Sequence, residues 1–554
     1  MTSPTAHPMP AHTNLSKKQV VISVIAIMST LLLSSMEQTI VGTAMPRIVA
    51  DLGGFEHYTW VTTAYLIAST IAMIVAGRLS DLYGRKPFLV GGTIIFIIGS
   101  FVCGAADSMG SLIFARAVQG LGGGTLMGLA FTTVADIFPP SRRGRVMGIM
   151  SAAFGISAIF GPTLGGIITD NFDWSWVFYF NVPIGLAVLA LMILGFPKLK
   201  PLNKVTTQPD YIGIILLAAF ITCFVLGLTW GGSQYPWGSW QIISLFAGSA
   251  VFLGLFIWLQ TRVKNPTFYL PIFKSRAFTP ASIVTFIVGI GMFISITFIP
   301  LYFQGVLGST ATTSGNFLTP MMLSNVIASA VLGMLLSKVP LFRNFGAIGV
   351  FIFMVGLFLL STMSPNTPGI LAVLYIIVAG IGLGMTMPTF SMVMQNSAPP
   401  GMVGMATSSN GLMRTLGGSV GLSFAGSSLA TQLMPNINKL VPDYISQALP
   451  PGFIEGIASN PHALFNTEAQ QQIYSAFAIF GENQQIYFDN FMDSVREALA
   501  STISSIFLVA ACIFVLGVII ALFMDDKPLR KQFIDSQETI KRLNATPPER
   551  PNIP

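Results

Sequence analysis

The feature that most constrains this chain is a succession of apolar stretches, each long enough to cross the hydrocarbon core of a membrane as a helix, which takes about 20 residues. Inside lipid, a crossing segment must pair its backbone polar groups within itself, as an α-helix does. Hydrophobic residues make up 53% of the chain and charged residues only 9%, against roughly 25% charged in soluble domains. We therefore expect an all-α membrane protein with fourteen spans, at residues 20–44, 57–77, 87–106, 111–134, 146–169, 176–196, 211–230, 240–260, 279–304, 313–336, 346–363, 369–392, 402–431 and 500–524.

The distribution of basic residues predicts how these spans are oriented. If the N-terminus is cytoplasmic, 23 of the 28 basic residues fall in loops on that side, Arg47, Lys439 and Arg496 lie outside, and Arg116 and Arg414 fall within spans. Loops rich in Lys and Arg stay in the cytoplasm, and one span missed or added would invert every later loop. The bias therefore predicts fourteen spans, cytoplasmic termini and a place in the cell membrane. It also explains the net charge of +7 without a nucleic-acid partner.

A long segment, 432–499, is expected to lie outside, between the last two spans. It carries seven acidic residues, and Ile473, Phe477, Phe480 and Phe488 recur at helical spacing. This periodicity predicts partial helix at the membrane surface, with a disordered insertion as the alternative. Residues 1–19 and 525–554 are expected to form cytoplasmic tails, and no cleavage site of a removed signal peptide follows the first apolar stretch.

Three ionisable side chains remain within the spans and away from their ends: Glu37, Arg116 and Arg414. A charge at the bilayer centre costs at least roughly 2.5 kcal/mol, so each needs a partner, a water-filled cavity or a change of protonation. Glu37 and Arg116 lie at similar depth, so they can pair or compete for a proton. Burial favours a protonated carboxyl group and a nearby cation favours the ionised form, which predicts proton coupling at Glu37. A static ion pair is the alternative, and for Arg414 we favour a structural role or a contribution to cavity polarity.

The loop after the second span, residues 77–87, reads GRLSDLYGRKP. Gly77 permits close helix approach, Asp81 can receive basic groups at a helix end, and Arg85 offers a partner in a charge cluster that must break when an inner gate opens. This segment resembles the signature loop of the major facilitator superfamily. We expect a conformational gate here, although charges that only set topology are the other interpretation. Its members would be Gly77, Asp81, Gly84 and Arg85, with Asp136 and Arg145.

Two further motifs lie in the fourth and fifth spans. Residues 112–122, LIFARAVQGLG, resemble the superfamily's intramembrane arginine motif, which is linked to proton transfer, and residues 155–166, GISAIFGPTLGG, resemble the motif of its proton-driven exporters. Pro162 removes one helical hydrogen bond and kinks the helix, while Gly161 and its neighbours leave a smooth face that can seal or slide against another helix. The second motif implies outward transport, because importers of this fold generally lack it.

Residues 37–46 (EQTIVGTAMP) and 174–185 (WSWVFYFNVPIG), together with fourteen spans, narrow the resemblance to the fourteen-helix drug:proton antiporter branch. Two departures concern the first span, where Glu37 stands for the usual Asp and Gly42 for the usual Asn. The longer acid still titrates, but its reach differs.

The resemblance implies a major facilitator fold with two six-helix bundles, each containing inverted repeats. The first bundle would occupy 20–196 and the second 279–524, with two additional spans at 211–260 inserted between them.

Patterns that would indicate an enzyme or a nucleotide-driven pump are missing from the sequence. The chain has no Gly-x4-Gly-Lys-Ser/Thr phosphate loop, and the Gly-rich runs at 120–124 and 380–384 lie inside apolar stretches, where they favour helix packing. The three cysteines have no paired spacing and all four histidines lie outside the spans, which disfavours a metal site. We expect no enzymatic activity and no cofactor, with a proton gradient as the energy source.

The leading hypothesis is a monomeric, proton-coupled exporter of hydrophobic, amphipathic or cationic organic compounds that works by alternating access. A lipid or envelope-precursor translocase on the same fold is the alternative, whereas a non-transporting receptor or intramembrane enzyme leaves the fifth-span glycines unexplained. Substrate contacts are sought among polar and aromatic residues within spans, each of which could also serve helix packing alone. These candidates are Gln38, Trp60, Tyr65, Tyr302, Phe303, Gln304, Asn325, Met385, Met387, Asn410 and Arg414.

Overall fold

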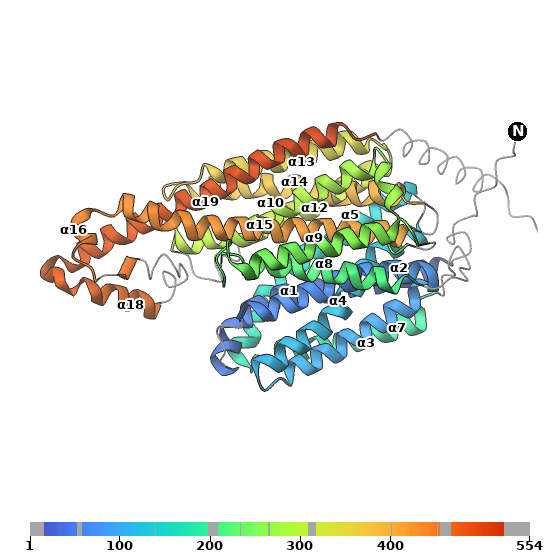
Figure 1. Cartoon of the computed structure of the whole chain (residues 1–554), viewed down its shortest axis with the longest axis horizontal. Helices are drawn as coiled ribbons and strands as arrows, with labels where there is room; N and C mark the ends of the chain where they lie inside the picture. The colour runs from blue at the N-terminus through green and yellow to red at the C-terminus, as the bar shows by residue number, and fades with distance from the viewer. Residues whose placement is uncertain are drawn as a thin grey trace, which may run out of the picture.

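The computed structural model describes residues 16–52, 58–138, 140–197, 209–232, 234–263, 266–308, 317–399, 402–450, 452–454 and 467–525. These residues are mostly α-helical, and no strand is formed among them. The long helices run nearly side by side (Figure 1). Most of the two expected tails, at 1–15 and 526–554, lies outside the described residues.

The first part of the chain forms one bundle, which we call the N-terminal half. Its helices are α1 (Lys17–Leu52), α2 (Tyr58–Tyr83), α3 (Arg85–Gly104), α4 (Met109–Ile137), α5 (Pro140–Asn171), α6 (Trp176–Tyr179) and α7 (Asn181–Gly195). α2 and α3 pack on α4, and α1 packs on α5. A side chain at Gly124 of α4 would strike the carbonyl oxygen of Ser69 in α2, so glycine lets these two backbones approach closely.

The later part of the chain forms a second bundle, which we call the C-terminal half. It contains α10 (Phe278–Gly305), α12 (Leu318–Leu336), α13 (Phe342–Ser361), α14 (Gly369–Asn396), α15 (Val403–Leu440) and α19 (Gln484–Leu522). α14 packs on both α12 and α13, and α10 packs on α15. Between the halves in the sequence come α8 (Tyr211–Trp230) and α9 (Trp240–Gln260), which pack on each other, and the 3-10 helix η3 (Leu270–Lys274). Figure 1 shows α8 and α9 in green between the blue and orange bundles.

Eleven candidate spans in the described residues are long and apolar enough to cross a membrane. They lie in α1, α2, α3, α6 with α7, α8, α9, α10, α12, α13, α14 and α19. α4, α5 and α15 have 29, 32 and 38 residues and are long enough, but their many Gly, Ser and Thr residues lower the hydropathy. Such small residues are also those that permit close helix packing in lipid. The count of fourteen spans therefore stays a prediction.

Segment 432–499 is helical over most of its described part. α15 continues to Leu440 and α19 begins at Gln484, and between them lie α16 (Asp443–Ser446), α18 (Thr467–Ala476) and the 3-10 helix η5 (Phe477–Asn483). Phe477 and Phe491 are fully buried, with ring centroids 5.2 Å apart. These helices project beyond the C-terminal half (Figure 1), and their apolar residues form a small core of their own. Residues 451 and 455–466 lie outside the described ranges.

The two halves touch through α5 against α12 and through α2 against α15. A side chain at Gly148 of α5 would lie 2.7 Å from the carbonyl oxygen of Ser329 in α12. The backbones of α5 and α12 are therefore in close contact, with no room for a side chain at Gly148.

Candidate functional site

A buried ion pair lies inside the N-terminal half. Glu37 of α1 and Arg116 of α4 are 0% and 1% exposed, and Nη1 of Arg116 lies 2.6 Å from Oε1 of Glu37. The two side chains meet because α1 packs on α4, as their similar depth in the sequence predicts. A buried pair is favourable only if its remaining polar atoms are also satisfied.

Helices α2 and α7 satisfy the remaining polar atoms of the pair, together with α4 itself. The side-chain amide of Asn181, at the start of α7, donates to Oε2 of Glu37. Arg116 donates to Oε1 of Gln119 at 2.6 Å and to the carbonyl oxygen of Val61 in α2 at 3.3 Å. Both oxygens of the carboxylate and most donors of the guanidinium are therefore engaged.

Further side chains seal this site. The centroid of the Tyr65 ring lies 4.3 Å from Cζ of Arg116, within the range of a cation–π contact. Nε2 of Gln119 donates to Oγ of Ser100 in α3 at 2.8 Å. Tyr65 is thus buried against Arg116, although the sequence proposed it for substrate contact. We call Glu37, Tyr65, Arg116, Gln119 and Asn181 the ion-pair cluster.

The ion-pair cluster can change its charge by proton binding at Glu37, because arginine does not give up its proton in proteins. While ionised, Glu37 is only an acceptor, and it takes hydrogen bonds from Arg116 and Asn181. Proton uptake requires these bonds to rearrange. Since Glu37 is fully buried, the helices must also move before water reaches it. Proton binding and helix movement are therefore linked at this site.

A second charged cluster lies where α2 ends and α3 begins. Nε of Arg85 lies 2.6 Å from Oδ2 of Asp136, and Nη2 of Arg85 lies 2.5 Å from Oδ1 of Asp81. The turn between the helices passes through Gly84, whose φ of 93° lies in the left-handed region that favours glycine. Gly84 therefore permits the turn that sets Arg85 between its two carboxylates.

Asp81 also binds the C-terminal half. Its Oδ1 and Oδ2 accept the backbone N–H groups of Gly404 at 3.0 Å and Met405 at 3.2 Å, in the first turn of α15, where free N–H groups and the helix dipole attract a carboxylate. A side chain at Gly77 would strike the carbonyl oxygen of Gly404 and the side chain of Ser408, so glycine is required for this approach. We call Asp81, Arg85, Asp136 and the first turn of α15 the latch.

Other polar contacts join the two halves at the same end. Nη1 of Arg143, at the start of α5, donates to Oδ1 of Asn396, at the end of α14, at 2.7 Å. The backbone N–H of Arg145 donates to Oγ of Ser337 at 3.2 Å, while the side chain of Arg145 is exposed. Arg145 thus meets the other half through its backbone, outside the charge cluster of the latch. The molecule is closed at the latch end.

The glycine-rich stretch of the fifth span lies between helices of both halves. A side chain at Gly155 would strike Val326 of α12, and Oγ of Ser35 in α1 donates to Oγ of Ser157 at 2.6 Å. Gly161 is buried, and the side chain of Pro162 lies outside the described residues. The stretch thus lies between α1 of its own half and α12 of the other half, where a smooth helix face could seal or slide.

The candidate substrate residues do not form one surface. Tyr302 and Phe303 are buried, and Phe303 stacks on Phe317 with ring centroids 3.7 Å apart. Asn410, Arg414 and Met387 line a common cavity. Of the others, Trp60 packs edge-on against Trp230, Asn325 is buried, Gln304 and Met385 are half-buried, and the side chain of Gln38 lies outside the described residues.

Sequence reasoning did not single out Asn181 or Gln119 as site residues. Both stand in segments that carry the family resemblance, but the predicted site consisted of charged residues. Each is an amide side chain within a long apolar stretch, where it needs a hydrogen-bond partner, and this pattern could have identified them. Each of them supplies such a partner to the ion pair.

Within the part of the chain that the structure describes, no group of three or more His, Cys, Asp or Glu side chains could hold a metal ion. Cys103, Cys223 and Cys512 are free thiols. The expectation that no cofactor is needed stays a prediction.

Comparisons with known proteins agree on one family. A sequence profile described as Major Facilitator Superfamily matches residues 27–422. Multidrug resistance protein 3 of Bacillus subtilis (strain 168) is 38% identical over 501 residues, which cover 90% of this chain and 94% of that protein. Multidrug transporter protein MdtP of the same organism is 33% identical over 546 residues, which cover 96% and 97%.

Two solved structures share the arrangement of helices at low sequence identity. The human organic anion transporter MFSD10 has a TM-score of 0.58 and 12% identity, with 90% of this chain and 100% of that one covered. The proton:xylose symporter XylE has a TM-score of 0.54 and 14% identity, with 91% and 95% covered. At these identities the likeness shows the fold alone.

Proposed function

This chain belongs to the major facilitator superfamily of multi-pass membrane transporters, and from that premise we propose that it is a proton-coupled exporter of hydrophobic, amphipathic or cationic organic compounds. Its family makes it a transporter of small molecules and not an enzyme. The two bacterial relatives described above are named for multidrug resistance and multidrug transport, which supports drug efflux as the activity of this chain.

The observation that carries the proton coupling is the ion-pair cluster. Glu37 is fully buried and bound by Arg116 and Asn181. A carboxyl group that moves between such a setting and one open to water changes its affinity for protons. A proton on Glu37 leaves Arg116 without its counter-charge and favours a different packing of α1 against α4.

The latch supports alternating access. Because Asp81 binds Arg85 within its own half and α15 of the other half, opening this end must break contacts on both sides of one carboxylate. In the proposed cycle, substrate enters from the cytoplasm or inner leaflet when the latch is open. It leaves on the outer side when the latch is closed, as Glu37 takes up a proton, and the proton gradient drives the return.

The proposal includes a topology. Fourteen helices cross the cell membrane, both termini are cytoplasmic, and the latch faces the cytoplasm. The basic residues near it, among them Arg85, Arg142 and Arg143, support this orientation. The transporter works as a monomer in the lipid bilayer and needs no cofactor besides the proton gradient.

Flux measurements in proteoliposomes test the coupling. We expect the protein to move ethidium, a fluorescent cation, against its gradient after a pH jump. Glu37→Gln keeps the shape of the side chain but cannot bind a proton, so pH-driven flux should fall to the level of empty liposomes while ethidium exchange without a pH gradient persists. Glu497→Gln, at an exposed position of α19, is the matched control and should behave as wild type.

If Glu37→Gln shows the pH-driven flux of wild type, Glu37 is not the residue that couples transport to protons. Loss of exchange as well as of pH-driven flux would favour the static alternative, in which the pair only fixes two helices together.

A further inference from the structure

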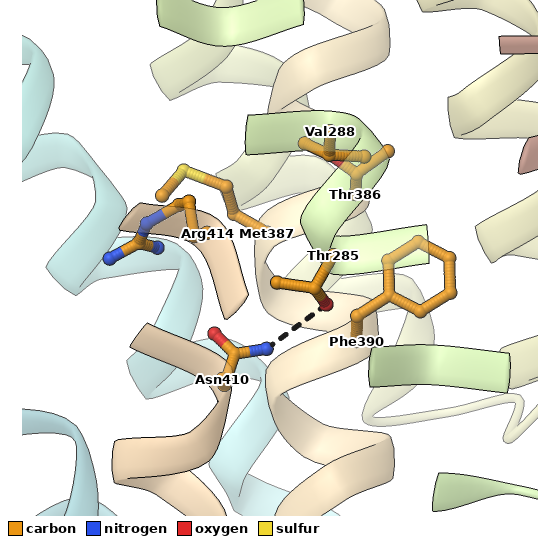
Figure 2. A pocket seen from close by; sticks show the side chains of 7 residues that line it. All are labelled: Thr285, Val288, Thr386, Met387, Phe390, Asn410 and Arg414. Atoms are coloured by element: carbon orange, nitrogen blue, oxygen red, sulfur yellow. Dashed lines mark hydrogen bonds between the residues drawn. The ribbon is translucent and has the colours of Figure 1, made fainter. Parts of the chain in front are cut away.

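A small cavity in the C-terminal half contains one charged side chain. It lies between α10, α14 and α15. Figure 2 shows Thr285, Thr386, Met387, Phe390, Asn410 and Arg414 around it, with the guanidinium of Arg414 pointing away from Thr285 and Phe390. Amide and hydroxyl groups beside a thioether and an aromatic ring are typical of the lining of small-molecule sites.

Arg414 has no counter-charge in the long stretch of chain around it. The sequence contains no Asp or Glu between residues 211 and 442, so the inserted helices and α10 to α15 cannot supply one. The intramembrane acid of the other half, Glu37, is already bound by Arg116 and Asn181. Among the residues that the structure describes, Arg414 makes no hydrogen bond or ion pair. A guanidinium in a membrane-embedded helix that lacks a protein partner needs water or a foreign anion.

Arg414 lies where the two halves face each other. On α15, Gly404 and Ser408 contact α2, and a side chain at Gly411 would strike Met73 of α2. Arg414 is three residues beyond Gly411, on the same side of the helix, and it is half-buried. Since it comes 11 positions after Val403, it stands about 16 Å from the latch end of α15, near the middle of a bilayer core of about 30 Å.

The polar neighbours of Arg414 bind one another. One helical turn earlier, Asn410 donates to Oγ1 of Thr285 and to Sδ of Met394, each at 3.3 Å, and accepts from Oγ of Ser391 at 3.3 Å. These contacts hold the amide in place beside the cavity. The cavity therefore has a fixed polar frame and an apolar wall, and the guanidinium of Arg414 stands at its edge, turned away from Thr285 and Phe390 (Figure 2). A positive charge beside an apolar wall matches an amphipathic molecule with an anionic head.

We propose that Arg414 binds the oxyanion of an amphipathic molecule, a carboxylate, sulfonate or phosphate group, and that the exported compounds therefore include organic anions. Guanidinium recognises such groups through two parallel hydrogen bonds. This inference rests on the proposed export function and deepens it, because an uncompensated cation beside the cavity favours anionic compounds over cationic ones at that position. The oxyanion can belong to a soluble compound or to a phospholipid headgroup.

The test compares dyes of opposite charge in proteoliposomes that contain wild type, Arg414→Gln or Arg414→Lys. For carboxyfluorescein, an anion, we expect pH-driven export to fall about tenfold or more in Arg414→Gln, as loss of a hydrogen bond to a charged group implies, and to recover in part in Arg414→Lys. Ethidium export should stay equal to wild type or rise. Fluorescently labelled phosphatidylglycerol, followed across the bilayer, distinguishes a lipid source: a loss confined to this lipid assigns the oxyanion to the headgroup.

Equal loss of anion and cation transport in Arg414→Gln would overturn the proposal, as would unchanged transport of both carboxyfluorescein and the labelled lipid. If wild type exports no dye, the export function fails. The binding of carboxyfluorescein to purified protein, measured by fluorescence polarisation, then still tests Arg414. Weaker binding in Arg414→Gln supports the inference, and unchanged or undetectable binding rejects it.

Discussion

Arg116 in the N-terminal half and Arg414 in the C-terminal half both stand in long helices, but their surroundings are opposite. Arg116 is fully buried and bound to Glu37, Gln119 and the carbonyl of Val61. Arg414 is half-buried beside a cavity, in a region of sequence, 211–442, that has no carboxylate. The arginine of the first half thus has a counter-charge within the protein. Under our proposal, Arg414 obtains its counter-charge from a molecule that enters the cavity.

The largest difference in stability between the halves should appear when each arginine is replaced in turn. Arg116→Met leaves Glu37 buried without its cation, which should cost about 3–5 kcal/mol of folding free energy, as for other broken buried pairs. Arg414→Met removes a charge that has no protein partner among the described residues, and should change stability by about 0.5 kcal/mol or less. Unfolding of the purified variants in detergent measures both. Equal destabilisation would mean that Arg414 has a structural partner and that the contrast is wrong.

A smaller effect is expected from the two asparagines that serve the two sites. Asn181→Ala removes a hydrogen bond to a charged carboxylate, worth about 1.5–3 kcal/mol, whereas Asn410→Ala removes bonds to neutral groups, worth about 0.5–1.5 kcal/mol each. The same unfolding measurement compares them, with Asn344→Ala, at an exposed position, as the control. A loss per removed hydrogen bond that is larger for Asn410→Ala than for Asn181→Ala would contradict a charged site in the first half and neutral polar contacts in the second.

A further effect is expected at the surface where the halves meet. Gly77→Ala pushes a methyl group against Gly404 and Ser408, and overpacking of this kind costs about 1–3 kcal/mol. We expect it to favour molecules that are open at the latch end. Gly91→Ala is the matched control, because a side chain there meets no atom within 4 Å.

The readout for Gly77→Ala is the reaction of a water-soluble maleimide with Thr407→Cys, which lies in α15 and is 6% exposed, in a background without the three native cysteines. Labelling should increase with Gly77→Ala and stay constant with Gly91→Ala. If neither changes, the close approach at Gly77 does not hold the latch shut.

Much of this arrangement could be predicted from the sequence. The similar depth of Glu37 and Arg116 allowed the two to pair, and the charged residues of GRLSDLYGRKP indicated that Asp81 and Arg85 belong to one cluster. Such contacts can be predicted because a charged side chain within a membrane span needs a partner, and helical geometry sets its depth.

Other features depend on tertiary packing and could not be predicted in this way. Asn181 can bind Glu37 only because the start of α7 lies beside α1. No local sequence pattern indicates that these two helices are neighbours. Tyr65 was assigned to substrate for its residue type, but the packing of α2 on α4 places it against Arg116. Binding of Asp81 to the first turn of α15 joins residues more than 300 positions apart in the chain, beyond the reach of any motif.

The length of α15 has a mechanical consequence. With 38 residues it is about 57 Å long, nearly twice the thickness of a bilayer core of about 30 Å. Its first turn is held by Asp81, Arg414 stands a third of the way along, and its last turns belong to the projecting helical segment. Under the proposed topology the far end of α15 lies on the outer surface, so a movement there can be transmitted along the helix to the latch. We expect an antibody fragment that grips the projecting segment to alter maleimide labelling of Thr407→Cys at the opposite end, and unchanged labelling would show that the helix bends and absorbs the load.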